Sequence, residues 1–319
     1  MQTPGMTTPA STAEFEERRP LLFGLAYRML GSAEEAEDVV QDAFLRWSAT
    51  DREVIAHPTA WLTKVVTNLC LNRLTAARVQ RERYVGPWLP EPVLTADGAL
   101  GPLETVEQRD LVSFAVLVLL ERLTPVERAV FVLREAFGYS HREIAQILEI
   151  SEANCRQLHY RARRHLAQNT PRFKADHRQR RRLLETFLTA AREGDMASLE
   201  AMLTQDVVSW SDGGGEVGMA LRPIRGRDRV ARYFIGGIRR LVTYPRFHQV
   251  EVAYAEVNGE PAALYWLDGQ LAGVVVPDIT DELISGLRIV ANPKKLTFLA
   301  GQLARLSHSR QATGSSPVR

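Results

Sequence analysis

The sequence has little of what a disulfide-built, metal-built or membrane-embedded protein needs. Its 319 residues include two cysteines, Cys70 and Cys155. Both occupy apolar helical positions without the neighbouring ligands of a metal or redox site, so we expect reduced core residues. No apolar run approaches the length of a membrane span, and the first residues lack the apolar core of a signal peptide. These absences predict a cytoplasmic protein with no metal, no cofactor and no membrane partner.

Net charge is also nearly absent, but the charges are unevenly distributed. The formal net charge is +2. Between Ser151 and Arg182, ten lysines and arginines stand against two carboxylates, a local balance of +8, so the remainder sums to −6. Such asymmetry indicates that one part of the chain meets nucleic acid. The composition otherwise, 45% hydrophobic and 24% charged, is that of a globular protein with room for two or three domains.

The pattern from 123 to 166 predicts two short helices with a tight turn between them. Ser140 followed by Glu143 is a capping box for the first of the pair, and Ser151 caps the second. The inward residues of the second helix recur at helical spacing. They are Cys155, Leu158 and Ala162. Small and apolar residues at these positions are typical of a helix-turn-helix.

The outward side of this second helix carries amides and cations. Its residues are Asn154, Arg156, Gln157, Tyr160, Arg161, Arg163 and Arg164. Asparagine, glutamine and arginine can bond base edges in the major groove, and further arginines can hold phosphates. A structural hairpin with a solvated cationic face is the alternative. Capping, core spacing and surface chemistry agree, and this favours a DNA-reading helix-turn-helix.

Three more helices are expected before this pair, over residues 14–30, 33–47 and 58–78, the second capped by Ser32 and the third opened by Pro58. The second has an acidic outer side, which by itself is usually only solvated. Its residues are Glu37, Asp38, Gln41 and Asp42. The third carries a polar stripe able to contact unpaired bases, although alone this signal is weak. Its residues are Lys64, Asn68, Asn72 and Arg73.

A linker is expected between these helices and the helix-turn-helix. Residues 86–102 contain four prolines and three glycines, which is typical of a connection rather than an element. Trp88 and Leu89 are unusual in a free linker and predict that it docks on another surface. Residues 105–137 are expected to be helical again.

The C-terminal part has a different texture. Residues 181–203 predict two helices joined at Gly194-Asp195, and a third helix is expected over 229–241. Alternating apolar runs then extend from 247 to 293, with hairpin turns at Asn258-Gly259 and Asp268-Gly269. Helices followed by a meander of antiparallel strands predict an α+β domain whose curved sheet wraps around its helices.

Several separated motifs, in order, resemble a bacterial sigma factor of the sigma-70 family in its minimal extracytoplasmic-function form. They lie at 19–47, 57–74 and 123–166. Three further motifs resemble the subgroup with a C-terminal SnoaL-like domain. They are Trp88-Leu89-Pro90, Asp212-Gly213-Gly214-Gly215 and Asn292-Pro293-Lys294-Lys295-Leu296. The resemblance implies two all-α sigma domains, the second with a helix-turn-helix, followed by an α+β SnoaL-like (cystatin-like cone) domain.

The expected layout follows from these motifs. Sigma-70 region 2 is predicted at 14–84, a linker at 85–104, region 4 at 105–170, a basic linker at 171–180 and the SnoaL-like regulatory domain at 181–306. Residues 1–13 and 307–319 are expected to be disordered.

The resemblance gives these surfaces roles. Glu37, Asp38, Gln41 and Asp42 match the segment that grips the clamp helices of the β′ subunit of core RNA polymerase. The stripe from Lys64 to Arg73 matches the −10 reader, and the face from Asn154 to Arg164 matches the −35 reader. The implied partners are core polymerase, including its β flap, and promoter DNA. The implied function is promoter-directed transcription initiation, without enzymatic activity.

The subgroup resemblance implies that the C-terminal domain regulates the sigma domains in cis. The residues expected to dock are Trp88, Leu89, Pro90, Asp212, Gly213, Gly214, Gly215, Asn292, Pro293 and Leu296. The sequence departs from the family pattern in four places. At the position of Asn72 the family often has aspartate, and at the position of Glu149 helix-turn-helix proteins often have glycine. The subgroup usually has lysine at the position of Glu216 and an acidic residue at the position of Lys294.

A second interpretation stays open from the sequence. The chain could be a one-component DNA-binding regulator whose SnoaL-like domain senses a small-molecule ligand or acts as an enzyme. Asp212 or His248 would then serve as base, in a pocket lined by Trp210, Tyr254 and Trp266. No acid, base and oxyanion donor recur at fixed spacing, so catalysis has no motif to support it.

Overall fold

The computed structural model describes residues 9–51, 55–82, 84–95, 98–100, 103, 106–167, 177–243 and 249–312. The chain forms two compact units. The first comprises residues 1–82, 98–112 and 116–170, and the second comprises 83–97, 113–115 and 171–319. The linker residues 83–97 therefore belong to the same unit as the C-terminal domain.

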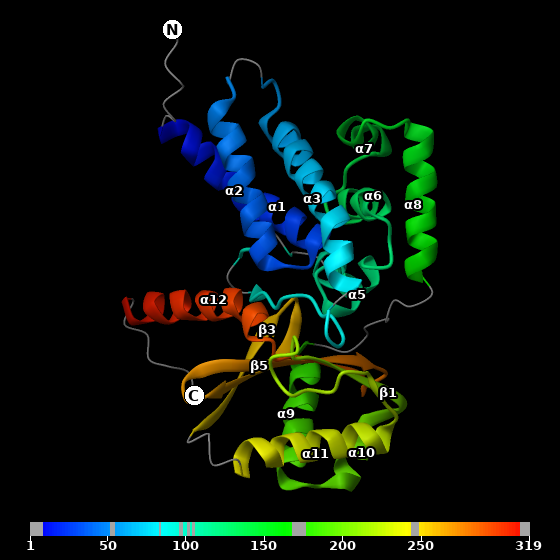
Figure 1. Ribbon diagram of the computed structural model, residues 1–319, viewed down its shortest axis with the longest axis vertical. Coiled ribbons are helices and arrows are strands. Elements are labelled where there is room, and N and C mark those ends of the chain that lie inside the picture. Colours follow the sequence, from blue (N-terminus) through cyan, green and yellow to red (C-terminus); the bar gives the residue numbers. More distant parts are fainter. Residues whose placement is uncertain are drawn as a thin grey trace. The chain divides into compact units, whose positions relative to one another are not determined.

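The first unit begins with three packed helices, coloured blue to cyan in Figure 1. They are α1 (Pro9–Leu30), α2 (Ala33–Ala49) and α3 (Pro58–Glu82). The Ser32 hydroxyl accepts a hydrogen bond from the Glu35 amide at 3.1 Å, so the predicted cap is confirmed. Helix α1 starts at Pro9, where proline suits the first helical turn. Residues 9–13, expected to be disordered, are thus helical, and residues 1–8 lie outside the described range.

Residues 106–135 lie in the stretch that was expected to be helical, and they form three short helices. They are α4 (Val106–Asp110), α5 (Phe114–Leu120) and α6 (Pro125–Glu135). A capping box of Thr124 and Glu127 starts α6. Pro125 lacks the N–H that an unbroken helix requires, so a helix cannot run through this point. The helical part therefore begins anew at Pro125, as α6.

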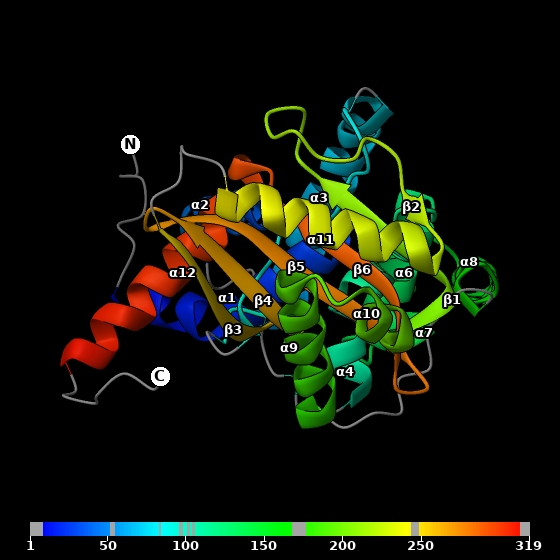
Figure 2. The ribbon, with the colours of Figure 1, turned by 90° about the horizontal axis from the view of Figure 1, so that it is seen from below.

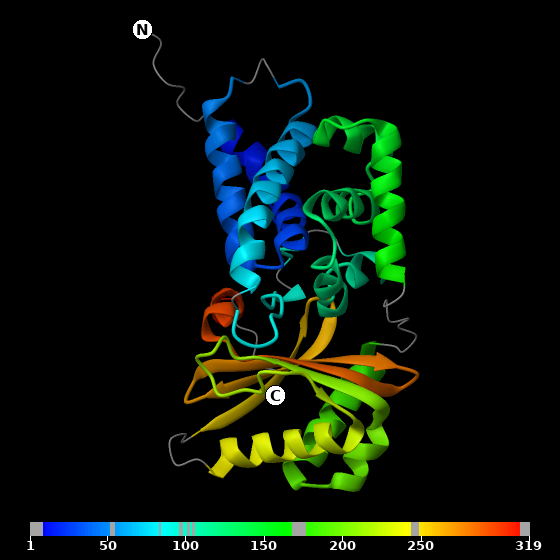
Figure 3. The same cartoon turned by 45° about the vertical axis from the view of Figure 1, so that its right-hand side comes forward.

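The helix-turn-helix consists of α7 (His141–Leu148) and α8 (Glu152–Ala167), green in Figure 3. The capping box of Ser140 and Glu143 is present, and Ser151 caps α8 by accepting the Asn154 amide at 3.2 Å. Glu149 occupies the left-handed region, with φ of 57°, at the turn between the two helices. The predicted core residues of α8 are buried. They are Cys155, Leu158 and Ala162.

The second unit places three helices on one face of a sheet, as Figure 2 shows. They are α9 (His177–Glu193), α10 (Met196–Met202) and α11 (Arg227–Thr243). Helix α9 starts at His177, so residues 177–180 of the expected basic linker are helical. The break between α9 and α10 falls at Gly194-Asp195 as predicted, and Asp195 caps α10 by accepting the Ser198 amide at 3.1 Å.

The sheet has six strands in the order β2-β1-β6-β5-β4-β3. They are β1 (Leu203–Asp212), β2 (Ile224–Arg225), β3 (Val250–Val257), β4 (Glu260–Leu267), β5 (Gln270–Thr280) and β6 (Leu283–Val290). Strands β3 to β6 form the predicted antiparallel meander, with positive φ angles at Asn258-Gly259 and Asp268-Gly269. Strand β1 pairs with β6 in parallel, so the sheet is mixed rather than wholly antiparallel. Helix α11 and the four strands β2 to β5 intervene, and such a long crossover allows parallel pairing.

The two faces of this sheet have different neighbours. Val207, Leu287 and Ile289 belong to the apolar core with α9, α10 and α11. Since side chains alternate along a strand, Asp212 and Arg288 lie on the opposite face. Helix α12 (Pro293–Ala312) lies on that opposite side of the sheet in Figures 1 and 3. It continues past residue 306, where the domain was expected to end, and residues 313–319 lie outside the described range.

Within the described ranges, every helix is too short or too polar to cross a bilayer.

Candidate nucleic-acid interface and linker-docking site

The predicted DNA-reading face of α8 is exposed. All seven predicted residues are accessible, and Tyr160 exposes 67% of its surface. Arg156 pairs with Glu152 on the same helix, and Arg161 lies 3.8 Å from Glu127. Arg163 and Arg164 have no carboxylate within ion-pair distance among the residues described. The face therefore combines a preoriented arginine with further cations available to phosphates.

Behind α8 lies a chain of polar groups that the sequence analysis missed. His141 Nε2 is 3.2 Å from His159 Nδ1, and His159 Nε2 is 2.7 Å from Glu135 Oε1. The three residues come from α7, α8 and the end of α6, so the chain joins these three helices. Burial, with the neighbouring His159 and nearby arginines, lowers the pKa of His141. The three residues are distant in sequence and form no local motif that could have revealed them.

The acidic side of α2 and the polar stripe of α3 meet at Arg73. Its guanidinium donates to Asp38 at 3.2 Å and to Asp42 at 3.0 Å. Asn68 and Asn72 are exposed. A helix turns about 100° per residue, so Arg73 points away from the stripe that Asn68 and Asn72 share. Arg73 is therefore placed with the acidic side rather than with the stripe.

The remaining predicted residues of these two helices are also engaged or exposed. Glu37 pairs with Arg19, and Gln41 is exposed. Lys64 Nζ lies 2.8 Å from Glu149 Oε1 in the turn of the helix-turn-helix. Beside it, the hydroxyls of Thr63 and Tyr139 are 2.9 Å apart. Lys64 of the α3 stripe thus contacts the turn of the helix-turn-helix, while Asn68 and Asn72 stay accessible.

In the second unit, one buried carboxylate binds the linker through hydrogen bonds. Asp212 is 0% exposed and accepts hydrogen bonds from the Leu89 amide at 2.8 Å and the Tyr84 hydroxyl at 2.5 Å. It also accepts from the Gly214 amide and, at 2.7 Å, from Lys295 Nζ. Burial, followed by the hydrogen bond to Asp212, raises the pKa of Tyr84, so its hydroxyl stays a donor. The four donors satisfy the buried charge.

Lys295 completes this arrangement from α12. Its Nζ donates to the Leu89 carbonyl at 2.5 Å and lies 4.3 Å from the Trp88 ring centre and 4.7 Å from that of Tyr84. An ammonium between two aromatic faces is favoured by cation–π attraction. The predicted aromatic anchor of the linker therefore stacks on a cation, which the sequence analysis did not assign.

The triglycine loop and the Asn292 motif also touch here. Asn292 Nδ2 donates to the Tyr84 hydroxyl at 2.8 Å. Gly214 has a φ of +61°, and a Cβ at this residue would lie 2.3 Å from Asn292 Nδ2. Glycine is needed at this position both for its backbone conformation and for space. Leu89, Pro90 and Leu296 are buried beside these groups.

A second set of hydrogen bonds holds the end of the linker. The amide and carbonyl of Val93 bond with the side chain and amide of Asn258, each at 2.9 Å. The Leu94 amide donates to Gln302 Oε1 at 2.8 Å, and the Gly259 amide donates to Thr95 Oγ1 at 2.8 Å. The sequence analysis interpreted Asn258-Gly259 only as a hairpin turn. The turn also binds the linker backbone.

Two departures from the family pattern compensate each other. Lys294 Nζ lies 2.6 Å from Glu216 Oε1, and this hydrogen bond raises the pKa of Lys294. The sequence has the acid where a base is usual and the base where an acid is usual. The charges are exchanged and an ion pair is formed.

The residues proposed for a catalytic pocket do not come together. Asp212 is occupied by the linker and lies on the sheet face away from α9, α10 and α11. Trp210 stacks on Arg288 at 5.0 Å, Tyr254 packs against the apolar core, and Trp266 is half-buried. His248 lies outside the described residues. Asp212 therefore does not act as the base of a pocket enclosed by the helices.

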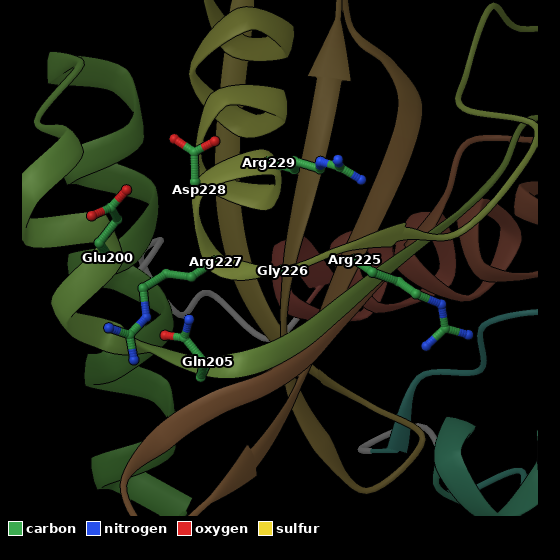
Figure 4. A pocket seen from close by; sticks show the side chains of 7 residues that line it. All are labelled: Glu200, Gln205, Arg225, Gly226, Arg227, Asp228 and Arg229. Atoms are coloured by element: carbon green, nitrogen blue, oxygen red, sulfur yellow. The ribbon is translucent and has the colours of Figure 1, made fainter.

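An open hollow of about 370 Å³ lies beside the start of α11 (Figure 4). Its lining residues are Glu200, Gln205, Arg225, Gly226, Arg227, Asp228 and Arg229. In Figure 4 Arg227 turns toward Gln205, whereas Arg225 and Arg229 extend to the other side. The sequence analysis did not single out these arginines.

Comparison with known proteins identifies the helical parts. Residues 15–79 match the family model "Sigma-70 region 2", and residues 113–166 match "Sigma-70, region 4". The chain is 37% identical over 297 residues to the ECF RNA polymerase sigma factor SigJ of Mycobacterium tuberculosis, covering 89% of this chain and 93% of SigJ. The chain belongs to the extracytoplasmic-function family of RNA polymerase sigma factors. This sigma factor works with core RNA polymerase and promoter DNA.

The similarity extends through the C-terminal domain of the sigma factor. The crystal structure of SigJ matches with a TM-score of 0.71 and 34% identity, covering 90% of this chain and 98% of that structure. The probable ECF sigma factor SigI of Mycobacterium tuberculosis is 31% identical, covering 92% of this chain and 97% of SigI. The sigma factor thus consists of helical sigma domains followed by a SnoaL-like domain.

Proposed function

We propose that the C-terminal domain of this sigma factor controls promoter-directed initiation by holding the linker between regions 2 and 4. The buried Asp212–Lys295 pair, which bonds both the amide and the carbonyl of Leu89, carries this proposal. A buried carboxylate left without its donors is costly, by about 3–5 kcal/mol when one partner is removed. The linker is therefore part of the C-terminal domain's own polar core, and its release requires replacement contacts.

The contacts with polymerase are assigned from the surface of the first unit. We propose that the exposed acidic side of α2, with Asp38 and Gln41 at its centre, grips the clamp helices of the β′ subunit. Region 4 is proposed to contact the β flap while α8 reads the −35 element. Asn68 and Asn72 are proposed to read the −10 element, since their exposed amides can bond unpaired bases. Arg73 is proposed to orient Asp38 and Asp42.

The fused domain needs no catalysis for this role. Its most buried carboxylate, Asp212, is committed to the linker, as are Lys295 and the Tyr84 hydroxyl. Regulation in cis is the function that this use of the residues supports, with the domain acting as a binding module.

Run-off transcription with core polymerase tests the proposal. Lys295→Ala removes the cation that bridges Asp212 and Leu89, and we expect transcript yield to change several-fold. Lys294→Ala is the matched control, because this neighbouring lysine exposes 78% of its side chain and pairs with Glu216 instead. Thermal unfolding of both variants checks that the fold persists. Equal output from wild type, Lys295→Ala and Lys294→Ala, with all three folded, would contradict linker control.

A further inference from the structure

The segment leading into and along α11 is rich in arginine. Residues 222–240 contain seven arginines, no lysine and a single carboxylate, Asp228, which gives a local balance of +6. This excess is separate from the basic stretch between residues 151 and 182. It lies in the helical layer of the second unit, on the opposite side of the sheet from α12 (Figures 1 and 2).

Six of these arginines expose their side chains, and we call them the arginine face. They are Arg222, Arg225, Arg229, Arg232, Arg239 and Arg240. Arg229, Arg232 and Arg240 recur at helical spacing, so they follow one side of α11. Arg225 extends to the same side as Arg229 in Figure 4. Arg227 is half-buried and turns away, and it is not part of this face.

Four of these arginines, Arg222, Arg225, Arg229 and Arg232, contribute little to the fold through their charges. Arg232 pairs with Asp228 at 2.8 Å, a pair in which both side chains are mostly exposed. Arg222, Arg225 and Arg229 have no carboxylate within ion-pair distance among the described residues. Exposed ion pairs contribute about 0–1 kcal/mol, and unpaired like charges repel one another. Folding alone therefore does not account for the exposed side chains of Arg222, Arg225 and Arg229.

We propose that the arginine face binds the phosphate backbone of duplex DNA, as a second DNA contact in addition to that made by α8. Guanidinium groups match phosphate geometry with paired hydrogen bonds, which lysine cannot do. Arg229 and Arg240 are eleven residues apart on α11, a rise of about 17 Å. A DNA strand carries one phosphate per about 3.4 Å of duplex axis, so a row of guanidinium groups of this length can contact more than one phosphate.

Duplex DNA fits this face better than an acidic protein for a second reason. The same chain is a sigma factor and already meets promoter DNA through region 4, so the face operates at high local DNA concentration. A backbone contact adds affinity without sequence preference. The inference rests on the family assignment and not on the linker proposal, so either can fail alone.

Fluorescence anisotropy of the full chain with a labelled 30-base-pair duplex of arbitrary sequence, titrated at several salt concentrations, tests the inference. Arg225→Ala/Arg229→Ala removes two guanidinium groups that have no described carboxylate partner. The matched control is Arg192→Ala/Arg305→Ala, two exposed arginines of α9 and α12 with the same change in net charge. Each lost phosphate contact lowers the slope of log affinity against log salt by about 0.9. We expect a slope change of about 1.8 and a loss of affinity above tenfold at about 0.1 M salt.

The control should bind like wild type, and both variants should keep their thermal unfolding midpoints. An unchanged slope, equal losses in variant and control, or no measurable binding by wild type at low salt would overturn the inference. Weaker binding to core polymerase with an unchanged DNA slope would assign the face to an acidic protein surface instead.

Discussion

At the scale of single residues, His141 links protonation to region 4. Its ring stands beside His159, with Arg134 from α6 and Arg156 and Glu152 from α8 as charged neighbours. Burial of the ring, followed by the neighbouring His159 and the two arginines, disfavours the charged form. The pKa of His141 is therefore lowered from its ordinary value of 6.5. At pH values between this lowered pKa and 6.5, the folded state binds fewer protons at His141 than the unfolded chain does.

This difference predicts a loss of stability in mild acid. The contribution of His141 is complete above pH 6.5 and declines as pH falls toward the lowered pKa, because the unfolded state takes up the proton first. Thermal unfolding measured from pH 7.5 to 5.5 should show a weaker dependence in His141→Asn than in wild type. His57→Asn, at an exposed position of the first unit, serves as control. A dependence in His141→Asn as steep as that of wild type would contradict this role.

At the scale of the element, we propose that α8 divides its polar residues between two tasks. Asn154, Arg156 and Gln157 lie in its first turns, where a recognition helix enters the major groove. Arg163 and Arg164 lie near its end, without a described carboxylate partner. We propose that the first group reads bases and that the second binds phosphates.

Binding measurements separate these tasks. Gln157→Ala should cost about 1–3 kcal/mol on the preferred promoter and relax preference at one position, because a base contact is lost. Arg163→Ala should weaken binding to all sequences alike and lower the salt slope by about 0.9. Affinities for matched and scrambled −35 sequences provide the comparison. Equal, sequence-independent losses from both substitutions would refute the division.

Much of this element could be predicted because its signals are local. The capping residues Ser140 and Ser151 and the spacing from Cys155 to Ala162 are features of contiguous sequence. The linker contacts of Asp212 were only partly accessible. Its motif was identified through resemblance, but Lys295 and Gln302 bond the linker from about 200 residues away. The parallel pairing of β1 with β6 and the histidine pair of region 4 were not predicted for the same reason. No local pattern encodes a partner that is distant in the chain.

At the scale of the whole molecule, the linker is held as one segment. Residues 89–94 are all buried, and hydrogen bonds hold both ends of this stretch. Removing one end leaves buried backbone groups without partners at that end, at about 1–3 kcal/mol each. The segment is therefore expected to release as a unit.

Hydrogen exchange measures this coupling. In Gln302→Ala the Leu94 amide loses its acceptor, and we expect faster exchange at both Leu94 and Leu89. Lys295→Ala should have the same double effect from the other end. Lys294→Ala should leave both amides protected. Acceleration confined to the amide nearest each substitution would mean two independent attachments, contrary to this expectation.

Docking of the linker also limits the length of free chain between the two sigma domains. Twenty-three residues separate Glu82 at the end of α3 from Val106 at the start of α4. Fully extended, such a tether spans about 80 Å, at roughly 3.5 Å per residue. When the linker is bound as far as Thr95, ten residues lie between this bound segment and α4, and they span about 35 Å when fully extended. We therefore expect that binding or release of the linker by the SnoaL-like domain changes the spacing between promoter elements that this sigma factor can bind at the same time.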